Sequence, residues 1–218
     1  PYGDHTTVRE MAAALDELGG AATQPLYPRP WAMVSDTPFR FYKLWPYRGG
    51  VQTSFIASWP AGIRQHGLRT QFADVIDITP TALDIAGVAA PSTFRGVCQL
   101  PMHGASLRLV LEDPSAPSPR DTQYFELWGI RSIYHRGWKA VGIHTPGRPF
   151  AEDRWELYHV ENDFSESRNI ASENPERLET LKALWWAEAE KNGALPLLEA
   201  PRGRSGTYSQ AIRDDTKK

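Results

Sequence analysis

The sequence predicts a mixed α/β fold with a small antiparallel sheet near its C-terminal end, and three observations carry this prediction. An apolar, β-branched run at residues 51–59 is typical of a strand. Residues 79–87 and 172–193 have the apolar spacing and the terminal residues of helices. Between those two helices lie three aromatic and β-branched runs bounded by Gly or Pro, over residues 123–128, 131–143 and 155–160.

Composition narrows the classes of protein to consider. The 218 residues are enough for one large domain, or one domain and a small one. The net charge of −2 provides no field of one sign, and no apolar run approaches the ~20 residues of a membrane span. We therefore expect neither a nucleic acid nor a membrane as partner. The single cysteine fits a reducing cytosol or a bacterial periplasm, so location is left open, as is the oligomeric state.

The first half of the chain reads as helix, loop, strand and helix. A helix is expected to begin at Thr6-Thr7 and to end at Gly19-Gly20. Residues 21–38 contain four prolines and are expected to form an irregular loop. After the strand at 51–59, Thr79 is a candidate N-cap for a helix that has Pro80 at its first position and Gly87 at its end.

The second half is expected to form a separate small unit. Residues 112–119 are rich in Pro and Ser and read as a linker, and a turn is expected at Arg136-Gly137. The long helix should begin near Ser172 and end near Gly193. We therefore divide the chain into an α/β part, a β subdomain with a C-terminal helix, and a mobile tail, at residues 1–119, 120–200 and 201–218.

Lys43 is the strongest candidate for a functional residue. It stands six residues ahead of the Gly49-Gly50 pair, which opens the run at 51–59. A cation followed by a glycine turn and a buried strand can direct a positive charge at an anionic ligand beside a sheet. The alternative is a solvated surface charge whose stem lies along Tyr42 or Trp45.

Four blocks of the sequence resemble the sulfatase family, especially the bacterial arylsulfatases. The segment from Lys43 through Gly49-Gly50-Val51 to Trp59-Pro60-Ala61-Gly62-Ile63 is similar to the family's second active-site lysine segment. The later blocks resemble family motifs in the same order, together spanning roughly residues 36–190. They are Asp77-Ile78-Thr79-Pro80-Thr81, Gly104-Ala105-Ser106-Leu107, and Trp155-Glu156-Leu157-Tyr158 continued by Asp163-Phe164 and Asn169-Ile170-Ala171.

This resemblance implies a fold and an activity. The implied fold is the C-terminal part of an alkaline-phosphatase-like mixed sheet flanked by helices, closed by a small antiparallel sheet packed on a C-terminal helix. The implied activity is hydrolysis of a small-molecule sulfate ester, of an aryl type, by an arylsulfatase-like sulfuric ester hydrolase. The lysine that matches Lys43 contacts sulfate oxygens in such enzymes and helps to neutralise charge near the leaving oxygen.

The same resemblance implies that other parts of the machinery lie upstream of this chain. The family's nucleophile is a hydrated formylglycine made from Cys or Ser in C/S-x-P-x-R, and its calcium-type cation is held by Asp and Asn oxygens. Both belong to the upstream part, so we expect no metal ligand here and no turnover by this chain alone. Cys98 does not fit that motif, because its proline comes one position late and no arginine follows.

Other side chains have weaker claims to a functional role. Trp31, Trp45, Tyr47 and Trp128 could form the walls of an aryl-binding cleft, with core packing as the alternative. Trp45 and Tyr47 are favoured as substrate-binding residues because they are close to Lys43.

The remaining charged candidates read as structural. No histidine pair has a metal-ligand spacing, and His103, beside the Gly104 block, has the least certain role. Glu126 and Asp153-Arg154 read as charges at strand ends and turns.

Two functions stay open beside the sulfatase: a phosphonate or phosphate ester hydrolase of the same superfamily, and a non-catalytic sulfatase-like binding module.

Overall fold

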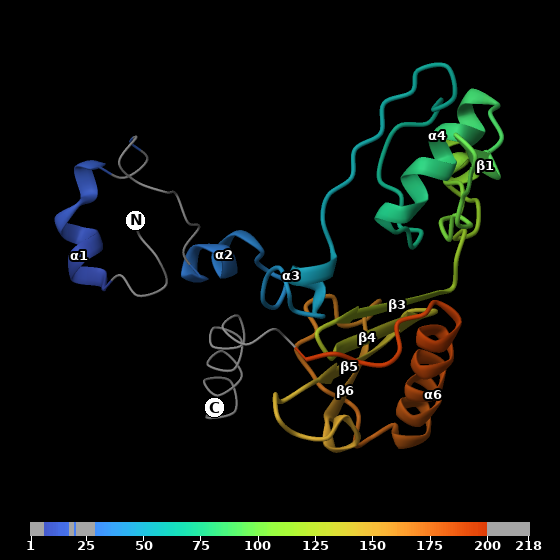
Figure 1. The fold of residues 1–218 in the computed structure, drawn as a ribbon. Coiled ribbons are helices and arrows are strands. Elements are labelled where there is room, and N and C mark those ends of the chain that lie inside the picture. Colours follow the sequence, from blue (N-terminus) through green and yellow to red (C-terminus); the bar gives the residue numbers. More distant parts are fainter. Residues whose placement is uncertain (1–6, 18–19, 21–28, 200–218) are drawn as a thin grey trace.

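The computed structural model describes residues 7–17, 20 and 29–199. Figure 1 shows two layers of structure around the segment that contains α3. A four-stranded sheet with α6 lies below it, and a part with α4 and a small hairpin lies above it. None of the described helices has the length and apolar character needed to cross a membrane.

The antiparallel sheet is the best-predicted part of the fold. Its strands are β3 (Thr122–Leu127), β4 (Ile130–His135), β5 (Trp138–Ile143) and β6 (Arg154–His159), and they pair in chain order. The expected turn joins β4 to β5, where Arg136 and Gly137 have φ of 46° and 81°. Two successive residues with positive φ are typical of a tight hairpin turn that matches the twist of the strands. The sheet and this turn are confirmed.

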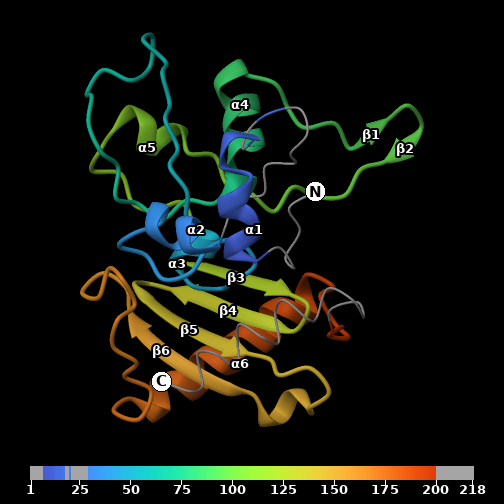
Figure 2. The ribbon, with the colours of Figure 1, turned by 90° about the vertical axis from the view of Figure 1, so that its left-hand side faces the viewer.

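The sheet is covered on both faces. Helix α6 (Pro175–Lys191), which confirms the expected long helix, runs along one face (Figure 2). Neighbouring residues in a strand point to opposite faces. Ala140 and Leu157 therefore pack toward α6 with Trp185, whereas Val141 and Tyr158 pack on the opposite face. The segment around Lys43 packs against that second face, through Trp45 and Tyr47.

The part above the sheet is built around α4 (Ile78–Ala86), which follows the 3₁₀ turn η2 (Val75–Asp77). Gly87 ends α4 with φ of 67°, as expected. The expected N-cap was wrong, because α4 begins earlier and Asp77, not Thr79, occupies the cap position. A two-strand hairpin, β1 (Thr93–Phe94) and β2 (Val97–Cys98), and helix α5 (Arg108–Glu112) complete this part.

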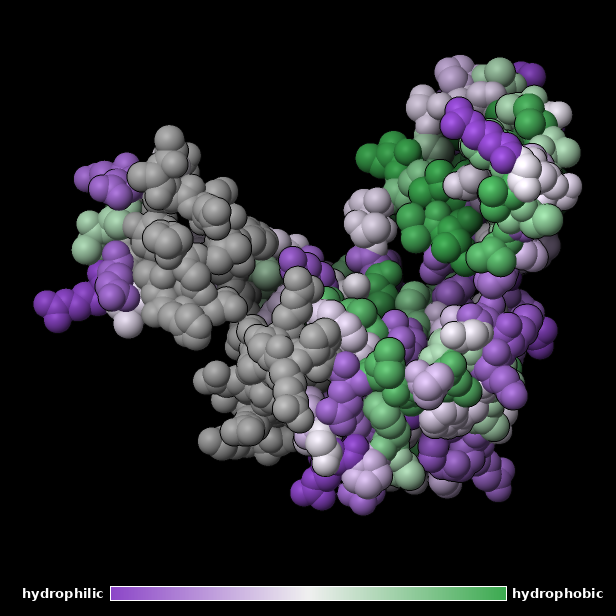
Figure 3. Space-filling model, in the orientation of Figure 1, coloured by the Kyte–Doolittle hydropathy of each residue, from purple (hydrophilic) through white to green (hydrophobic). Residues whose placement is uncertain are grey.

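The expected strand at residues 51–59 is not part of a sheet among the described residues. Helix α3 (Arg48–Val51) takes up its start, and residues 52–59 are extended without a paired strand. A strand forms only when a neighbour supplies hydrogen-bond partners, and no described strand lies beside this segment. Its side chains are consequently exposed, with Phe55 at 57% and Ile56 at 90%. In Figure 3, hydrophobic side chains gather on the part that carries α4.

The N-terminal residues contain short helices. Helix α1 (Val8–Ala13) has a capping box at its start, where Thr7 and Glu10 exchange hydrogen bonds, and the 3₁₀ turn η1 (Leu15–Glu17) follows it. Helix α2 (Arg29–Ser35) lies where a loop was expected; Pro30 is tolerated there because it falls in the first turn. The tail at 201–218 lies outside the described residues, and the domain division at 119 stays a prediction.

Candidate functional site

The loop that carries Lys43 has an unusual backbone shape. In residues 39–47, which we call the Lys43 loop, Phe41 and Leu44 have positive φ of 61° and 80°. Residues with large side chains rarely adopt positive φ, because Cβ crowds the backbone there. Packing around the loop must therefore hold it in this conformation.

Gly49 and Gly50 allow α3 to approach the Lys43 loop closely. A Cβ atom on Gly49 would lie 2.2 Å from the Phe41 carbonyl oxygen, and one on Gly50 would lie 2.0 Å from that of Trp45. The Gly49 amide also donates a hydrogen bond to the Arg40 carbonyl at 3.1 Å. The prediction that this pair opens a strand was wrong: the two glycines lie in α3, and their lack of a side chain makes room for the loop backbone.

Aromatic packing joins the loop to the sheet. Phe41 stacks on Trp45 and Tyr47, with ring centroids 4.4 and 5.0 Å apart. Trp45 is 5% exposed and Tyr47 is 2% exposed. Both belong to the core on the sheet face opposite α6, which also contains Ile130, Val141, Tyr158 and Val160. The loop is thus anchored by apolar burial at one end.

Lys43 itself is exposed. Within the part of the chain that the structure describes, its ammonium has no ion-pair or hydrogen-bond partner. The neighbouring residues Leu44 and Trp45 line a cleft of about 1340 Å³ between the sheet and the part that carries α4. Figure 3 shows the hollow between these two parts. The cleft also contains His103 and Arg120 in its wall.

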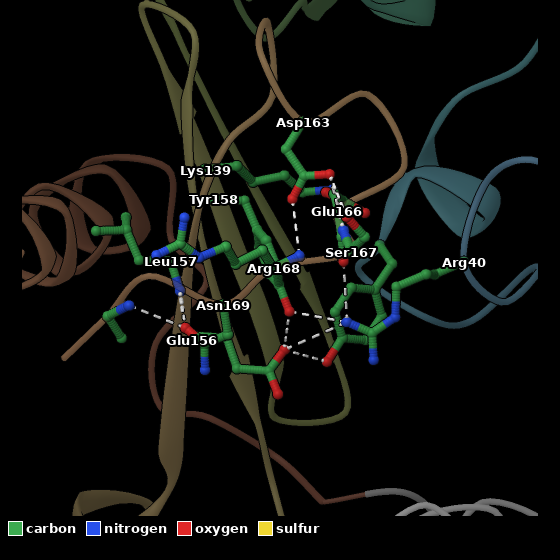
Figure 4. A network of polar contacts seen from close by, with 12 residues as sticks. Arg40, Lys139, Glu156, Leu157, Tyr158, Asp163, Glu166, Ser167, Arg168 and Asn169 are labelled. Carbon is green, nitrogen blue, oxygen red and sulfur yellow. Dashed lines mark hydrogen bonds and ion pairs between the residues drawn. The ribbon is translucent and has the colours of Figure 1, made fainter. Parts of the chain in front are cut away.

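Beneath the loop, one carboxylate on β6 accepts hydrogen bonds from two tyrosines. The Tyr47 hydroxyl donates to Glu156 Oε2 at 2.6 Å, and the Tyr158 hydroxyl donates to the same oxygen at 2.5 Å. Arg40 donates to the Tyr158 hydroxyl at 2.8 Å and lies 3.9 Å from Glu156 (Figure 4). Burial, and then the nearby Glu156 charge, raise the pKa of both phenols, so both stay protonated donors.

A second carboxylate holds the start of α3. Glu166 Oε2 accepts the Arg48 amide at 2.7 Å, and Glu166 Oε1 lies 2.7 Å from the Lys139 ammonium. Both partners of this ion pair are buried. Burial lowers the pKa of Lys139, and the Glu166 charge opposes that effect. The two carboxylates together tie the Lys43 loop and α3 to the sheet.

The last sequence block acquires a physical explanation from these contacts. Asp163 accepts the amides of Ser167 and Arg168, each at 2.9 Å, and thereby shapes the turn that presents Glu166 (Figure 4). Asn169 Oδ1 accepts the Leu157 amide at 3.0 Å and so joins this turn to β6. The Asp and Asn of the block are therefore structural residues.

The two middle blocks dock on each other. Asp77 Oδ1 accepts the Ala105 amide and Thr81 Oγ1 accepts the Leu107 amide, both at 2.8 Å. A Cβ atom on Gly104 would lie 1.9 Å from the Ile76 carbonyl oxygen, so this close contact needs glycine. An ion pair between Arg120 and the buried Asp77 then connects this unit to the start of β3.

The other predicted candidates are scattered. Trp31 is 62% exposed on α2, Trp128 lies in the β3–β4 turn, and of the four predicted aromatic residues only Trp45 lines the described cleft. Cys98 is an exposed free thiol in β2.

The charged candidates have structural contacts. Glu126 accepts the Gly129 amide at 2.9 Å, as a turn residue would. Asp153 is more deeply involved than expected: it pairs with the buried Arg131 and accepts from His144 Nδ1 at 3.0 Å.

Sequence reasoning missed how the loop is anchored. Glu156 belongs to one of the family-like blocks, but the sequence does not predict that it accepts two phenols, because Tyr47 is distant in the chain. Glu166, Lys139 and Arg40 carried no recognisable signal at all. Glu166 is the hardest of these residues to predict from sequence, because it is completely buried and has a positive φ of 54°.

A family model described as N-sulphoglucosamine sulphohydrolase, C-terminal, matches residues 39–190. The chain belongs to the sulfatase family. The match begins at the first residue of the Lys43 loop and includes all four sequence blocks. The resemblance inferred from those blocks is therefore confirmed.

Individual sulfatases are similar over parts of their length. The chain is 27% identical over 190 residues to an uncharacterized sulfatase of Schizosaccharomyces pombe, covering 86% of this chain and 34% of that protein. It is 32% identical over 104 residues to an arylsulfatase of Klebsiella aerogenes, covering 47% and 22%. The chain therefore spans about a third or less of the curated relatives it matches.

Solved structures support the fold. The crystal structure of Ps i-CgsB matches with a TM-score of 0.57 and 18% identity, over 83% of this chain and 38% of that one. The predicted mixed α/β class, of the alkaline-phosphatase-like fold, is confirmed. Sulfatases generally use a metal ion. The described residues include no group of three or more His, Cys, Asp or Glu side chains that could hold one, so they do not fit a metal centre.

Proposed function

We propose that this sulfatase chain is the C-terminal part of an arylsulfatase-type sulfuric ester hydrolase, and that Lys43 is the residue it contributes to the reaction. The observation that supports this role is an exposed ammonium without a described partner, on a loop anchored at both ends. An exposed, unpaired lysine is available to a ligand but also fits a solvated surface charge, and Lys43 is not itself among the residues that line the cleft. The kinetic test below separates these two roles.

Lys43 would act on the sulfate group. An ammonium close to sulfonyl oxygens neutralises negative charge as it moves toward the leaving oxygen, and a fixed position makes that effect larger. The nucleophile, a formylglycine hydrate, and a calcium-type cation would come from residues outside the described chain. They would supply the attack on sulfur and further charge neutralisation.

The substrate side of the proposal depends on the cleft. Trp45 lines it, but its side chain is only 5% exposed and stacks on Phe41, so only its exposed edge could meet a flat leaving group. Tyr47 is 2% exposed and its hydroxyl is bonded to Glu156, so we propose that it holds the loop rather than touching substrate. The similarity to an arylsulfatase favours an aryl ester. Ps i-CgsB, by contrast, has been solved in complex with k-i-k-neocarrahexaose, so a sugar-linked ester is the comparison to test.

The test is steady-state kinetics on the full-length protein with nitrophenyl sulfate. Lys43→Ala should lower kcat by roughly 10²-fold or more, the usual effect of removing one charge-stabilising group. Lys182→Ala, which removes a partly buried lysine paired with Glu179 on α6, is the control and should keep the normal rate. A normal rate in Lys43→Ala would refute the assignment.

Parallel assays separate the alternatives. Faster turnover of nitrophenyl phosphate than of the sulfate would indicate a phosphate ester hydrolase. Turnover of sulfated sugars but not of aryl sulfates would replace the aryl class. No turnover of any ester by the full-length protein would indicate a binding module.

A further inference from the structure

We propose that Glu156 is a positioning residue for Lys43, and that it acts by clamping both ends of the Lys43 loop through Tyr47 and through Tyr158 with Arg40. The rate consequence of this proposal rests on the proposed function of Lys43. The clamp itself is a statement about the loop and can be tested separately.

Strand β6 places the Glu156 carboxylate on the sheet face against which the Lys43 loop packs. Glu156 and Tyr158 are two residues apart on the strand, so both side chains lie on the face opposite α6. Glu156 pairs with Val141 of β5 in the sheet register, which fixes its backbone in the sheet. Figure 4 shows Glu156, Tyr158 and Arg40 converging on this face.

Both ends of the loop reach the same carboxylate. Arg40 precedes Lys43 by three residues, and its guanidinium donates to Tyr158, which donates to Glu156 Oε2. Tyr47 follows Lys43 by four residues and donates to that same oxygen. Residues 41–46, which include Lys43, therefore lie between Arg40 and Tyr47, and both of these residues are connected to the Glu156 carboxylate. Hydrogen bonds to an ionised acceptor are among the stronger ones in proteins, which suits a fixed geometry.

The contacts between the two ends support the clamp. The Arg40 guanidinium carbon lies 4.4 Å from the centre of the Tyr47 ring, so the loop ends also touch each other. Burial raises the pKa of both phenols, so neither donor is lost at neutral pH. The Lys139–Glu166 pair anchors α3 through the Glu166 side chain and does not involve Glu156, although Arg40 also donates to the Glu166 carbonyl at 3.2 Å.

The apolar contacts alone would not orient the loop in the same way. Stacking of Phe41 on Trp45 and Tyr47 keeps the loop on the sheet, but ring stacking is less directional than a hydrogen bond. Two short hydrogen bonds to one oxygen are directional and restrict the orientation of the loop. We therefore assign the orientation of the Lys43 loop to the hydrogen bonds of Glu156, and its burial on the sheet to the aromatic side chains.

The test uses the full-length protein and substitutions that remove single hydroxyl groups or a single charge. Tyr47→Phe keeps the ring and deletes one donor to Glu156, and Glu156→Gln removes the charge. Hydrogen–deuterium exchange of peptides within residues 40–51 should rise at least severalfold in both variants, while exchange in α6 stays unchanged. Glu173→Gln, which alters an exposed ion pair with Arg168, is the matched control. It should change hydrogen–deuterium exchange neither at residues 40–51 nor in α6.

A double-mutant cycle tests whether the clamp acts through Lys43. Tyr47→Phe should lower kcat on nitrophenyl sulfate roughly tenfold, since small misplacements of a reacting group reduce rates steeply. In the Lys43→Ala background the same change should alter kcat less than about twofold, because the group being positioned is gone. An equal loss of kcat in both backgrounds would overturn the proposal and indicate a general structural role.

The exchange data decide the clamp even if the proposed function fails. Suppose Lys43→Ala has a normal rate. Faster exchange at residues 40–51 in Tyr47→Phe would then still support the clamp, and only the function of Lys43 would be withdrawn. Unchanged exchange in Tyr47→Phe would overturn the clamp whatever the kinetics. If Glu156→Gln does not fold, Tyr47→Phe alone carries the test.

Discussion

Adding one methyl group at Gly50 should disturb the Lys43 loop more than its size suggests. The new Cβ would lie 2.0 Å from the Trp45 carbonyl oxygen and 2.6 Å from that of Tyr42, whereas real Cβ atoms stay beyond 3.0 Å. The backbone must therefore move by about 1 Å, the difference between 3.0 and 2.0 Å. Neither obstacle is a side chain that could rotate away. We expect Gly50→Ala to destabilise the protein by roughly 1–3 kcal/mol, as overpacking does.

The same displacement should reach Lys43, which lies between Tyr42 and Trp45 in the chain. A shift of about 1 Å in a catalytic group can lower turnover by roughly 10²-fold. The assay is kcat on nitrophenyl sulfate with the full-length protein, together with its melting temperature. Gly50→Ala should lower both.

Gly147→Ala is the control for stability without displacement of the loop. Gly147 has φ of 81°, and a Cβ atom added there would meet no heavy atom within 4 Å, so alanine brings backbone strain but no clash. It should lower stability by about 1–2 kcal/mol and leave kcat unchanged. Equal kcat values in the two variants would refute the reasoning that connects Gly50 to Lys43.

Two further predictions concern stability. Lys139→Met should destabilise the full-length protein by roughly 3–5 kcal/mol in urea unfolding, because Glu166 is left buried without its cation. Adding Glu166→Gln should recover part of that loss, and no recovery would show that the buried charge is not the cause. The isolated 218-residue chain should bind a hydrophobic dye and melt broadly, because residues 52–59 have no strand paired with them among the described residues and expose Ile56. A sharp cooperative transition would contradict this expectation.

The predictions that succeeded rest on local chemistry. Gly87 and the turn at Gly137 were predictable because glycine adopts positive φ without a steric cost. Helix α6 was predictable from its spacing of apolar residues and from Pro175 at its start.

The predictions that failed depend on distant partners. The run at 51–59 has the composition of a strand, yet composition does not supply a neighbour, and no described strand pairs with it. Gly49 and Gly50 were expected to make a turn, whereas their reason for being glycine is the loop backbone that crosses them. Trp45 and Tyr47 could be placed near Lys43 by sequence, but their burial against β4 and β5 could not.

The packing of the Lys43 loop on the small sheet has a consequence for recombining sulfatases. Residues 39–51 and the strands of the sheet share one core, although the whole α4 part separates them along the chain. A chimera joined near residue 119 would combine the Lys43 loop of one parent with the four-stranded sheet of another. Side chains that do not match would then meet at Tyr47 and Glu156. A junction ahead of residue 39 would take the Lys43 loop and the sheet from the same parent, so their contacts would stay matched.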